Sequence, residues 1–472
     1  MEEVSSASLA QLPHEMLKFV LQHTSASEGA ARLGQLSFRA RPTTINTPHY
    51  LVPTSRGVIP HLSQDNVQRH TKITAVYLPL EDFIEKSHAD APIYSTPVQK
   101  GESRLRRYTC LPDQCLSVVG PRRVPSISPP AHNTNSSIAI STSYGFRFLE
   151  VQQYNKAVKD LDVDVSVSLA DVVTAETASA KRIEKSADRT HAWLADMVES
   201  QRGDASEATP VFASIPPLEP QLLSLYLSDL RDEYTSHISG LCIYSPSTMV
   251  AVPEGLRQLP TICLDDPPTP QAVLAAIYAG VDLITVPFAT QSSEYGIALS
   301  FSFPFPGSTE PCPSEQPLGT DMWSTTHATD LSPLSPDCEC YTCQRHHRAY
   351  VHHLLQANEM LAWTLLQIHN YSIIDSLFAS IRRSIAQGTF DADVQTFGRA
   401  YRSELPKQTG QGPRVRGYQM KSVGRGEPKK NPRQYGRLDD QVQKLAEAES
   451  GVATPDGDAE DIEKHGLAKR VE

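Results

Sequence analysis

Residues 338–370 read CECYTCQRHHRAYVHHLLQANEMLAWTLLQIHN and contain the most informative pattern of the chain. Cys338, Cys340 and Cys343 are spaced Cys-x-Cys-x2-Cys, so three thiols fall within six residues. Thiols this close along a chain pair poorly as disulfides, but they can surround one face of a tetrahedral Zn²⁺ ion. The pattern therefore predicts a zinc site in which the protein supplies all four ligands, which makes the site structural rather than catalytic.

The spacing alone does not decide the fourth ligand. The histidines within residues 338–370 are His346, His347, His352, His353 and His369. His369 lies near the end of residues 346–370, whose apolar spacing predicts a helix that can pack back across the cysteine loop. The adjacent pair, His346 and His347, would give a more compact site. A cysteine cluster without a metal is the remaining alternative.

Upstream of this stretch, residues 160–287 alternate between short apolar runs and amphipathic segments. The runs predict strands at 163–169, 210–215, 240–244, 261–264 and 281–286, and the segments predict helices at 181–199, 220–234 and 270–278. This alternation is typical of a parallel sheet with helical crossovers. The number of repeats favours an α/β fold of the (β/α)8 TIM-barrel type, with an open sheet as the alternative.

The rest of the chain divides by composition. Residues 1–145 are expected to form N-terminal strands and the start of the barrel, 146–301 the barrel core, 302–337 a mobile insertion, 338–400 a zinc-binding helical subdomain and 401–472 a disordered tail. Extended runs predict strands at 17–21, 35–40, 49–53 and 73–80, and residues 121–143 predict a loop. Two helices are expected in the zinc-binding part, at 346–370 and 372–387. The basic part of the tail, 407–437, is either an RNA-phosphate contact or a solvated segment without a partner.

The bulk composition is that of a soluble globular protein. Of the 472 residues, 39% are apolar and 21% are charged. We expect no integral membrane segment, because the chain lacks a run of about eighteen apolar residues, and a cytoplasmic location, because it lacks a secretory signal. The five scattered cysteines, Cys110, Cys115, Cys242, Cys263 and Cys312, are expected to be buried apolar residues. We expect no DNA binding, since the net charge is −11 and no basic recognition helix flanks the cysteines.

Residues 338–370 resemble the zinc-binding C-terminal region of the tRNA-guanine transglycosylases. In that family the Cys-x-Cys-x2-Cys group is followed by Arg-Ala-Tyr-aliphatic-His-His-Leu and then by a His-Asn pair. Residues 348–354 and the pair His369-Asn370 match this pattern. The resemblance implies that His369 is the fourth ligand, so the expected metal site is Cys338, Cys340, Cys343 and His369 with one Zn²⁺ per chain.

Other segments are similar to the same family. Residues 54–57 and 60–62 resemble a T-(S/K)-x-G-x-x-P-H-L motif of its accessory members, and residues 181–189 resemble the helix after the family's fourth-strand region. Residues 280–283 match its Gly-(Val/Ile)-Asp-(Leu/Met) segment, and residues 296–303 resemble an accessory-member motif, Gly-Cys-Ala-Leu-Thr-Phe-Ser-Phe. The resemblance covers about residues 15–390 and implies a (β/α)8 barrel with a zinc-binding subdomain.

The residues that the family uses for catalysis are replaced. The family exchanges a base through a covalent ribose intermediate, with one aspartate as nucleophile and a second for proton transfer. The nucleophile position falls on Thr285, whose hydroxyl without an adjacent base is a poor nucleophile. Asp282, three residues earlier, is expected to point to the opposite face of the strand. Three further active-site motifs are replaced by residues 135–137, 212–217 and 239–241.

The resemblance therefore implies a non-catalytic accessory member without catalytic residues of its own. Its expected partners are tRNA and a catalytic queuine tRNA-ribosyltransferase subunit, with which it would form a heterodimer. That complex replaces guanine by queuine at the wobble position of the tRNAs for Asp, Asn, His and Tyr, in queuosine biosynthesis. A cytoplasmic place is expected, with peripheral attachment to the mitochondrial outer membrane as an option. The alternatives are a complete transglycosylase with an unrecognised carboxylate and a zinc-stabilised scaffold that does not bind RNA.

Overall fold

The structure, a computed structural model, describes residues 17–24, 30–38, 41–85, 91–129, 131–173, 178–201, 209–306 and 315–413. These residues belong to one compact unit, Met1–Ser422. A second unit, Val423–Glu472, and most of the expected tail lie outside the described residues. In the described part, no helix has both the length and the apolar character needed to cross a membrane.

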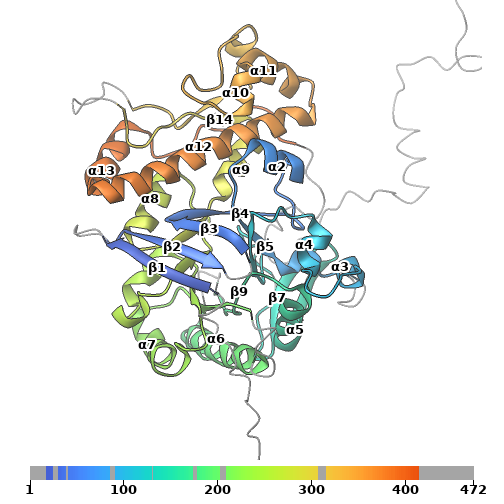
Figure 1. The fold of residues 1–472 in the computed structure, drawn as a ribbon, viewed down its shortest axis with the longest axis vertical. Helices are drawn as coiled ribbons and strands as arrows, with labels where there is room; N and C mark the ends of the chain where they lie inside the picture. The colour runs from blue at the N-terminus through green and yellow to red at the C-terminus, as the bar shows by residue number, and fades with distance from the viewer. Residues whose placement is uncertain are drawn as a thin grey trace, which may run out of the picture. The chain divides into compact units, whose positions relative to one another are not determined.

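Eight parallel strands close into a barrel in the order β10-β11-β12-β13-β4-β5-β6-β9 (Figure 1). Their bounds are β4 His49–Pro53, β5 Ala75–Pro79, β6 Leu116–Gly120, β9 Val165–Val167, β10 Val211–Ile215, β11 Gly240–Ile243, β12 Thr261–Cys263 and β13 Leu283–Thr285. Pairing of β13 with β4 completes the closure. The structure thus confirms the predicted α/β fold of the (β/α)8 type.

Helices surround the strands. They are α2 Gln64–His70, α3 Pro92–Ser95, α4 Arg104–Thr109, α5 Val151–Leu161, α6 Ala180–Gln201, α7 Pro220–Asp229, α8 Pro270–Tyr278 and α9 Pro287–Glu294. The three helices predicted in the barrel core are confirmed as α6, α7 and α8; after α7 the chain continues as a π-helical turn, Leu230–Tyr234. Because strand side chains alternate, Leu51, Tyr77 and Phe212 fill the barrel interior, while Tyr50 and Val76 pack in the outer core with the helices.

An antiparallel sheet of β1 Leu17–Thr24, β2 Arg32–Phe38 and β3 Arg41–Thr47 closes the amino end of the barrel. Leu36 and Ile45 of this sheet belong to the same buried cluster as the barrel interior. The Arg32 side chain binds the carboxylate of Asp282, the residue that precedes β13, with an Nε–Oδ1 distance of 2.9 Å. This buried ion pair joins the sheet to the strand that ends at Thr285.

The prediction of a loop at residues 121–143 is wrong for its last residues, from 137 onward. Residues after 136 form an antiparallel hairpin of β7 Ser137–Thr142 and β8 Gly145–Glu150. Ile138 and Ile140 of β7 are buried in the outer core. The predicted loop is found only up to β7.

The C-terminal region packs on one side of the barrel (Figure 1). It contains β14 Ile297–Leu299, β15 Gly319–Asp321, α10 Tyr341–Arg345, α11 Arg348–Gln356, α12 Met360–Gln387 and α13 Phe390–Ala400. Strands β14 and β15 pair antiparallel, so the expected insertion at 302–337 contributes a strand; its residues 307–314 lie outside the described part.

The two helices predicted at 346–370 and 372–387 are divided differently in the structure. Helix α11 ends at Gln356, and Asn358 adopts a left-handed conformation with φ of 53°. An Asn in this conformation commonly ends a helix. Helix α12 then runs without interruption from Met360 to Gln387 and therefore includes His369, Asn370 and the whole of the predicted second helix.

Candidate metal centre

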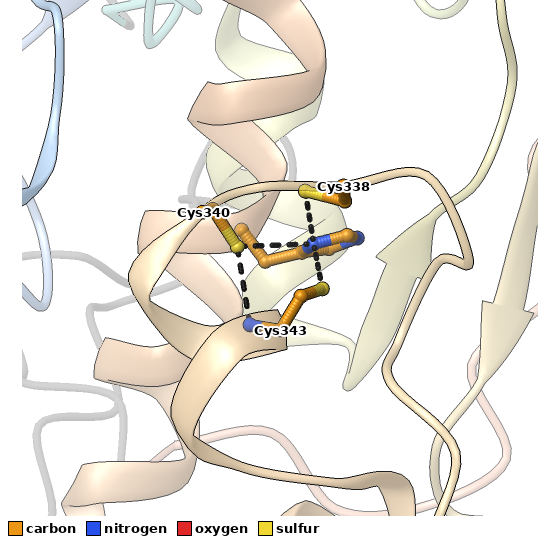
Figure 2. Close-up of side chains that lie close together, drawn as sticks. Cys338, Cys340 and Cys343 are labelled. Atoms are coloured by element: carbon orange, nitrogen blue, oxygen red, sulfur yellow. Dashed lines mark hydrogen bonds between the residues drawn. The ribbon is translucent and has the colours of Figure 1, made fainter.

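The three cysteines lie in a turn and at the start of α10. Cys340 is the N-cap of this helix, and its Sγ accepts a hydrogen bond from the Cys343 backbone N–H at 3.4 Å. The Thr342 hydroxyl donates to the Leu365 carbonyl at 2.7 Å and so fixes α10 against α12. Figure 2 shows the resulting arrangement, in which the sulfurs of Cys338, Cys340 and Cys343 surround one ring nitrogen.

That nitrogen is Nδ1 of His369, which projects from α12 and is fully buried. It lies 3.6 Å from Sγ of Cys338, 3.6 Å from Sγ of Cys340 and 3.3 Å from Sγ of Cys343. All four atoms lie within 4.8 Å of one another. A tetrahedral zinc with ordinary Zn–S and Zn–N bonds requires S···N edges of about 3.6 Å. The cysteine–histidine cluster (Cys338, Cys340, Cys343 and His369) therefore has the size to hold a metal ion.

The opposite ring nitrogen of His369 is fixed by the backbone of β14. Nε2 lies 2.8 Å from the Leu299 carbonyl oxygen and donates a hydrogen bond to it, so the ring is held with Nδ1 toward the sulfurs. The neighbouring Asn370 binds the same strand: its Oδ1 accepts from the Leu299 N–H at 2.8 Å, and its Nδ2 donates to the Ile297 carbonyl at 3.0 Å. The His-Asn pair thus orients the ring and ties α12 to β14.

The other histidines of this region have different contacts. His347 caps α11, where its Nδ1 accepts from the Tyr350 N–H at 3.2 Å, and His346 stacks on the Tyr350 ring at 5.1 Å. His352 is buried, with Nδ1 at 2.9 Å from the Met322 carbonyl oxygen, and His353 is exposed on α11. Among the described residues, the only group suited to a metal ion is the cysteine–histidine cluster. The structure therefore brings His369 to the cysteines and leaves the competing histidines out.

The thiols of the cluster are close enough to share their protons. Hydrogen bonds with the thiols of Cys340 and Cys343 lower the pKa of the Cys338 thiol well below its usual range, and the corresponding interactions raise the pKa of the Cys340 thiol. The Ser372 hydroxyl oxygen lies 3.9 Å from the Cys338 sulfur and accepts a hydrogen bond from its thiol. A thiolate is the form of cysteine that binds metals, so the cluster has the chemistry as well as the dimensions of a metal centre.

Residues around the cluster form a support that the sequence did not reveal. Arg348 donates to the Pro333 and Leu334 carbonyls, both at 3.1 Å, and so holds the segment that leads to Cys338. A separate apolar core lies under α10, α11 and α12, and it includes Val351, Leu355 and Trp363. Arg348 and Val351 belong to the stretch 348–354, whose pattern was noted in the sequence, but their partners lie in segments distant along the chain.

A comparison with known families supports the same fold and site. The family model described as queuine tRNA-ribosyltransferase matches residues 27–403, a span that includes the barrel and the cysteine–histidine cluster. This chain belongs to the queuine tRNA-ribosyltransferase family. The resemblance to tRNA-guanine transglycosylases in the sequence is thereby confirmed.

Relatives in this family have been named as accessory subunits. The Schizosaccharomyces pombe protein called queuine tRNA-ribosyltransferase accessory subunit 2 is 34% identical over 397 residues, 84% of this chain and 87% of the relative. Proteins of the same name from Anopheles gambiae and Drosophila melanogaster are 30% and 29% identical, over 78% and 79% of this chain and 87% and 90% of their own lengths.

Thr285, the residue to which the resemblance assigns the position of the family's nucleophile, lies at the barrel mouth, by which we mean the carboxyl ends of the barrel strands and the residues that follow them. Thr285 ends β13 and is fully buried, and its hydroxyl donates to the Asp265 backbone carbonyl at 2.5 Å. Asp282 lies at the amino end of the same strand, where it binds Arg32 and accepts from the Thr261 N–H at 2.8 Å. Asp282 therefore points away from Thr285, as the three-residue offset predicts.

Two acidic residues that follow β5 share one arginine at the mouth. The Glu81 carboxylate accepts from Arg123 Nε at 2.7 Å, and the Asp82 carboxylate accepts from Arg123 Nη2 at 3.0 Å. Burial raises the pKa of Asp82 to about 6, against the opposing effect of Arg123. These carboxylates are committed to the protein's own side chains.

A third acidic residue of the barrel mouth, Asp171, forms ion pairs with two arginines. Asp171 follows β9 and is fully buried, and its oxygens bind Arg182 at 2.6 Å and Arg189 at 3.0 Å. Asp265, which follows β12, differs from it: its carboxylate accepts from the Asp266 N–H at 2.8 Å and has no ion pair within the described residues. Burial raises the pKa of Asp265. Asp265 is thus a carboxylate of the mouth for which the described part of the chain provides no arginine partner.

Proposed function

We propose that this chain is a non-catalytic subunit of a queuine tRNA-ribosyltransferase heterodimer. It supports the exchange of guanine for queuine at the wobble position of the tRNAs for Asp, Asn, His and Tyr by binding the catalytic partner and tRNA. The observation that carries the proposal is Thr285: at the position of the family's nucleophile stands a hydroxyl that donates to a backbone carbonyl. A carboxylate is needed there to attack the ribose, and threonine has no base beside it.

We further propose that the cysteine–histidine cluster holds one Zn²⁺ ion. Three thiols and one imidazole form the donor set that zinc prefers, and the distances fit a tetrahedron. With four protein ligands and a buried histidine, no position is left for a substrate, so the ion would stabilise the fold. Its role would be to join the turn before α10, the helix α12 and the strand β14.

The surface near this centre is our candidate for the partner interface. Met360 and Leu361, at the start of α12, are 69% and 44% exposed, and Tyr341 of α10 is 37% exposed. The Tyr341 ring lies 4.2 Å from the ring of His70, which belongs to α2 of the barrel. Exposed apolar side chains on a rigid support are typical of protein interfaces.

The test of this function is a base-exchange assay with labelled guanine and tRNA. We expect incorporation only when the catalytic partner is added, and we expect the two chains to co-purify as a heterodimer in the cytoplasmic fraction, with any mitochondrial outer-membrane pool released as a peripheral protein. Incorporation by the purified chain alone would refute the non-catalytic assignment. A pair that assembles but does not bind tRNA would instead support the scaffold alternative.

The variant Met360→Asp/Leu361→Asp tests the interface. A charge at each of two exposed apolar positions should weaken co-purification with the partner, while the folded chain and its metal content stay unchanged. The matched control is Leu225→Asp on α7, an apolar residue that is 68% exposed and lies outside the C-terminal region.

Asp265 is the residue on which the alternative of a self-sufficient enzyme would depend. Its carboxylate has no arginine partner, and its backbone carbonyl accepts from Thr285, so it lies beside the nucleophile position. If the purified chain alone shows exchange, Asp265→Asn should abolish it. Under the accessory assignment, the heterodimer with Asp265→Asn should keep its exchange rate.

A further inference from the structure

Beyond α13 the chain continues along the C-terminal region as residues 402–412, which we call the strap. The match to the family model ends at residue 403, so nearly all of the strap lies beyond it. The Arg402 N–H donates to the Gln316 carbonyl at 2.9 Å, and the Arg402 carbonyl accepts from the Gln271 side chain at 2.9 Å. Leu405 packs against the main core. The first part of the strap is therefore fixed to α8 and to the segment before β15.

The far end of the strap is fixed to β15 and to the residues that follow this strand. The Thr409 hydroxyl donates to the Asp321 carboxylate at 2.5 Å. Gly410 lies so close to the indole ring of Trp323 that a Cβ atom at this position would overlap the ring. The strap thus makes a polar contact with the last residue of β15 and an apolar contact two residues later, and only glycine fits at the second point.

Trp323 connects this contact to the core beneath the metal centre. Its ring also lies against Gly296, where a Cβ atom would again overlap it, and its Nε1 donates to the Tyr295 carbonyl at 3.2 Å. Gly296 has a φ of 76°, which favours glycine in addition. Trp323 packs against the apolar core that lies under α10, α11 and α12. The indole is therefore held between the strap, the residue before β14 and this core.

The strands β14 and β15 connect the strap to a residue of the cysteine–histidine cluster. In this pair, Asp321 lies opposite Ile297 and Gly319 lies opposite Leu299. The Leu299 carbonyl accepts from Nε2 of His369 at 2.8 Å. The strap therefore holds β15, β15 pairs with β14, and β14 orients the histidine ring.

Groups that orient a metal ligand change the affinity for the metal although they do not touch the ion. We propose that the strap is an intramolecular clamp on the metal centre, which positions His369 through β15 and β14 and so helps to retain the ion. Because coupling between two binding events is reciprocal, an ion at the cluster also favours the docked strap. This inference rests on the proposal that the cluster holds Zn²⁺, and it gives residues beyond the family match a role at that centre.

The experiment measures the affinity of the full-length chain for zinc by competition with a chromogenic chelator. Two variants remove the clamp: a chain that ends at Ser403, and Gly410→Ala, which places a methyl group against Trp323. Each variant has a matched control. A chain that ends at Pro413 keeps the strap and lacks only the residues after it, and Gly398→Ala adds a methyl group on α13 where nothing lies within 4 Å.

Release of the strap is measured on the same zinc-loaded proteins by acrylamide quenching of tryptophan fluorescence. The chain has three tryptophans, of which Trp193 and Trp363 are only 1% and 2% exposed. Trp323 is half-buried and lies against Gly410, so release of the strap should raise the quenching through this residue. Circular dichroism checks that each variant is folded.

We expect both strap variants to bind zinc about five- to hundredfold more weakly than the wild type and to show stronger quenching. The two controls should match the wild type in both measurements. Asp171→Ala is a further comparison, because it breaks an ion pair in another part of the fold and should leave the zinc affinity unchanged. A loss confined to the strap variants would show that the strap acts on the metal centre and not through general stability.

Four results would overturn the inference. The strap variants could bind zinc as the wild type does although the quenching rises, or the quenching could stay unchanged in the chain that ends at Ser403. The chain that ends at Pro413 could lose as much affinity as the chain that ends at Ser403, or Asp171→Ala could lose as much as Gly410→Ala. A wild-type chain that binds no zinc would refute the metal proposal together with this inference, whereas the non-catalytic assignment, which base exchange tests, would stand.

Discussion

The cysteine–histidine cluster and the barrel mouth are two polar centres of one molecule, and they are built differently. At the cluster, each ligand atom lies at the distance that a metal ion needs, and Leu299 orients the ring of His369 from behind. At the mouth, Asp171 and Glu81 are bound by arginines, and Thr285 donates to the backbone. The first centre is prepared for an external ion, whereas the second is filled by its own side chains.

This difference shows that the contacts that hold the fold of an enzyme family can be separated from the residues that its reaction needs. The barrel, the closing sheet and the cluster depend on many contacts distributed over the chain, so the fold is retained. Under the proposed function, the chemistry would depend on a carboxylate at the end of one strand, a position where this chain has Thr285.

The largest expected effect comes from breaking the cluster. Cys340→Ser should reduce the zinc content from about one per chain to near zero and lower the free energy of unfolding by more than about 4 kcal/mol, because the metal's binding energy is part of the folding energy. Metal analysis and thermal melting measure both. Cys110→Ser is the control, since this thiol follows α4, is not part of the cluster and is exposed, contrary to the expectation that it is buried. A Cys340→Ser chain that keeps its zinc and its melting temperature would contradict the ligand set.

A somewhat smaller loss of stability is expected when an ion pair at the barrel mouth is broken. Asp171→Ala leaves Arg182 and Arg189 without their buried partner, and uncompensated charges of this kind cost about 3–5 kcal/mol of stability. Urea unfolding measures the loss. Asp265→Ala is the matched change, since that carboxylate lies at the same mouth without an ion pair, and it should stay within about 0.5 kcal/mol of the wild type. Equal losses in the two variants would mean that the arginines are not what distinguishes the two carboxylates.

A third prediction concerns the contact between α12, which carries the cluster residue His369, and the barrel strand β4. Asp375 lies on α12, the helix that carries His369, and accepts a hydrogen bond from Tyr50 of β4. Burial raises the pKa of Asp375 from 3.8 to about 6. The folded chain therefore holds a proton at a pH where the unfolded chain has lost it. The stability from this group is fully present below about pH 4 and decreases as the pH rises through about 6.

The change attributable to Asp375 is about 2–3 kcal/mol, from roughly two pKa units. Asp375→Asn keeps an acceptor for Tyr50 but cannot titrate, so the difference in unfolding free energy between wild type and variant should vary with pH between 4 and 6. Urea unfolding over this range gives the two curves. Parallel curves would show that Asp375 does not titrate on folding.

The sequence predicted the barrel well because strand and helix periodicity are local properties. It failed where a contact between distant segments decides the structure. Residues 121–143 are rich in Ser and Pro, yet β7 forms there because Glu81, Arg122 and Arg123 of the barrel mouth bind its edge. The break between α11 and α12 did have a local signal, the Asn358 that ends α11.

The candidate metal site, like the fold, could be predicted only partly from the sequence. Three cysteines within six residues are a local pattern, but the histidine that completes the cluster lies 26 residues beyond Cys343 and was chosen only by family resemblance. The contact of His369 with Leu299 spans 70 residues, and that of Arg32 with Asp282 spans 250. Spacing cannot predict pairs so far apart, so the support of the cluster and the pairing of Asp282 with Arg32 are visible only in the structure.

The smallest expected loss of stability comes from a change at Thr285. This change also tests directly whether the barrel mouth takes part in the reaction. Thr285→Val removes the hydroxyl that donates to the Asp265 carbonyl and keeps the shape of the side chain, so it should cost about 1 kcal/mol of stability. If the mouth of this chain takes no part in the chemistry, the heterodimer that contains Thr285→Val should exchange guanine at the wild-type rate. A rate that falls by a factor of ten or more, with assembly and tRNA binding unchanged, would place the hydroxyl in the reaction. The barrel mouth would then be a second active site rather than a filled one.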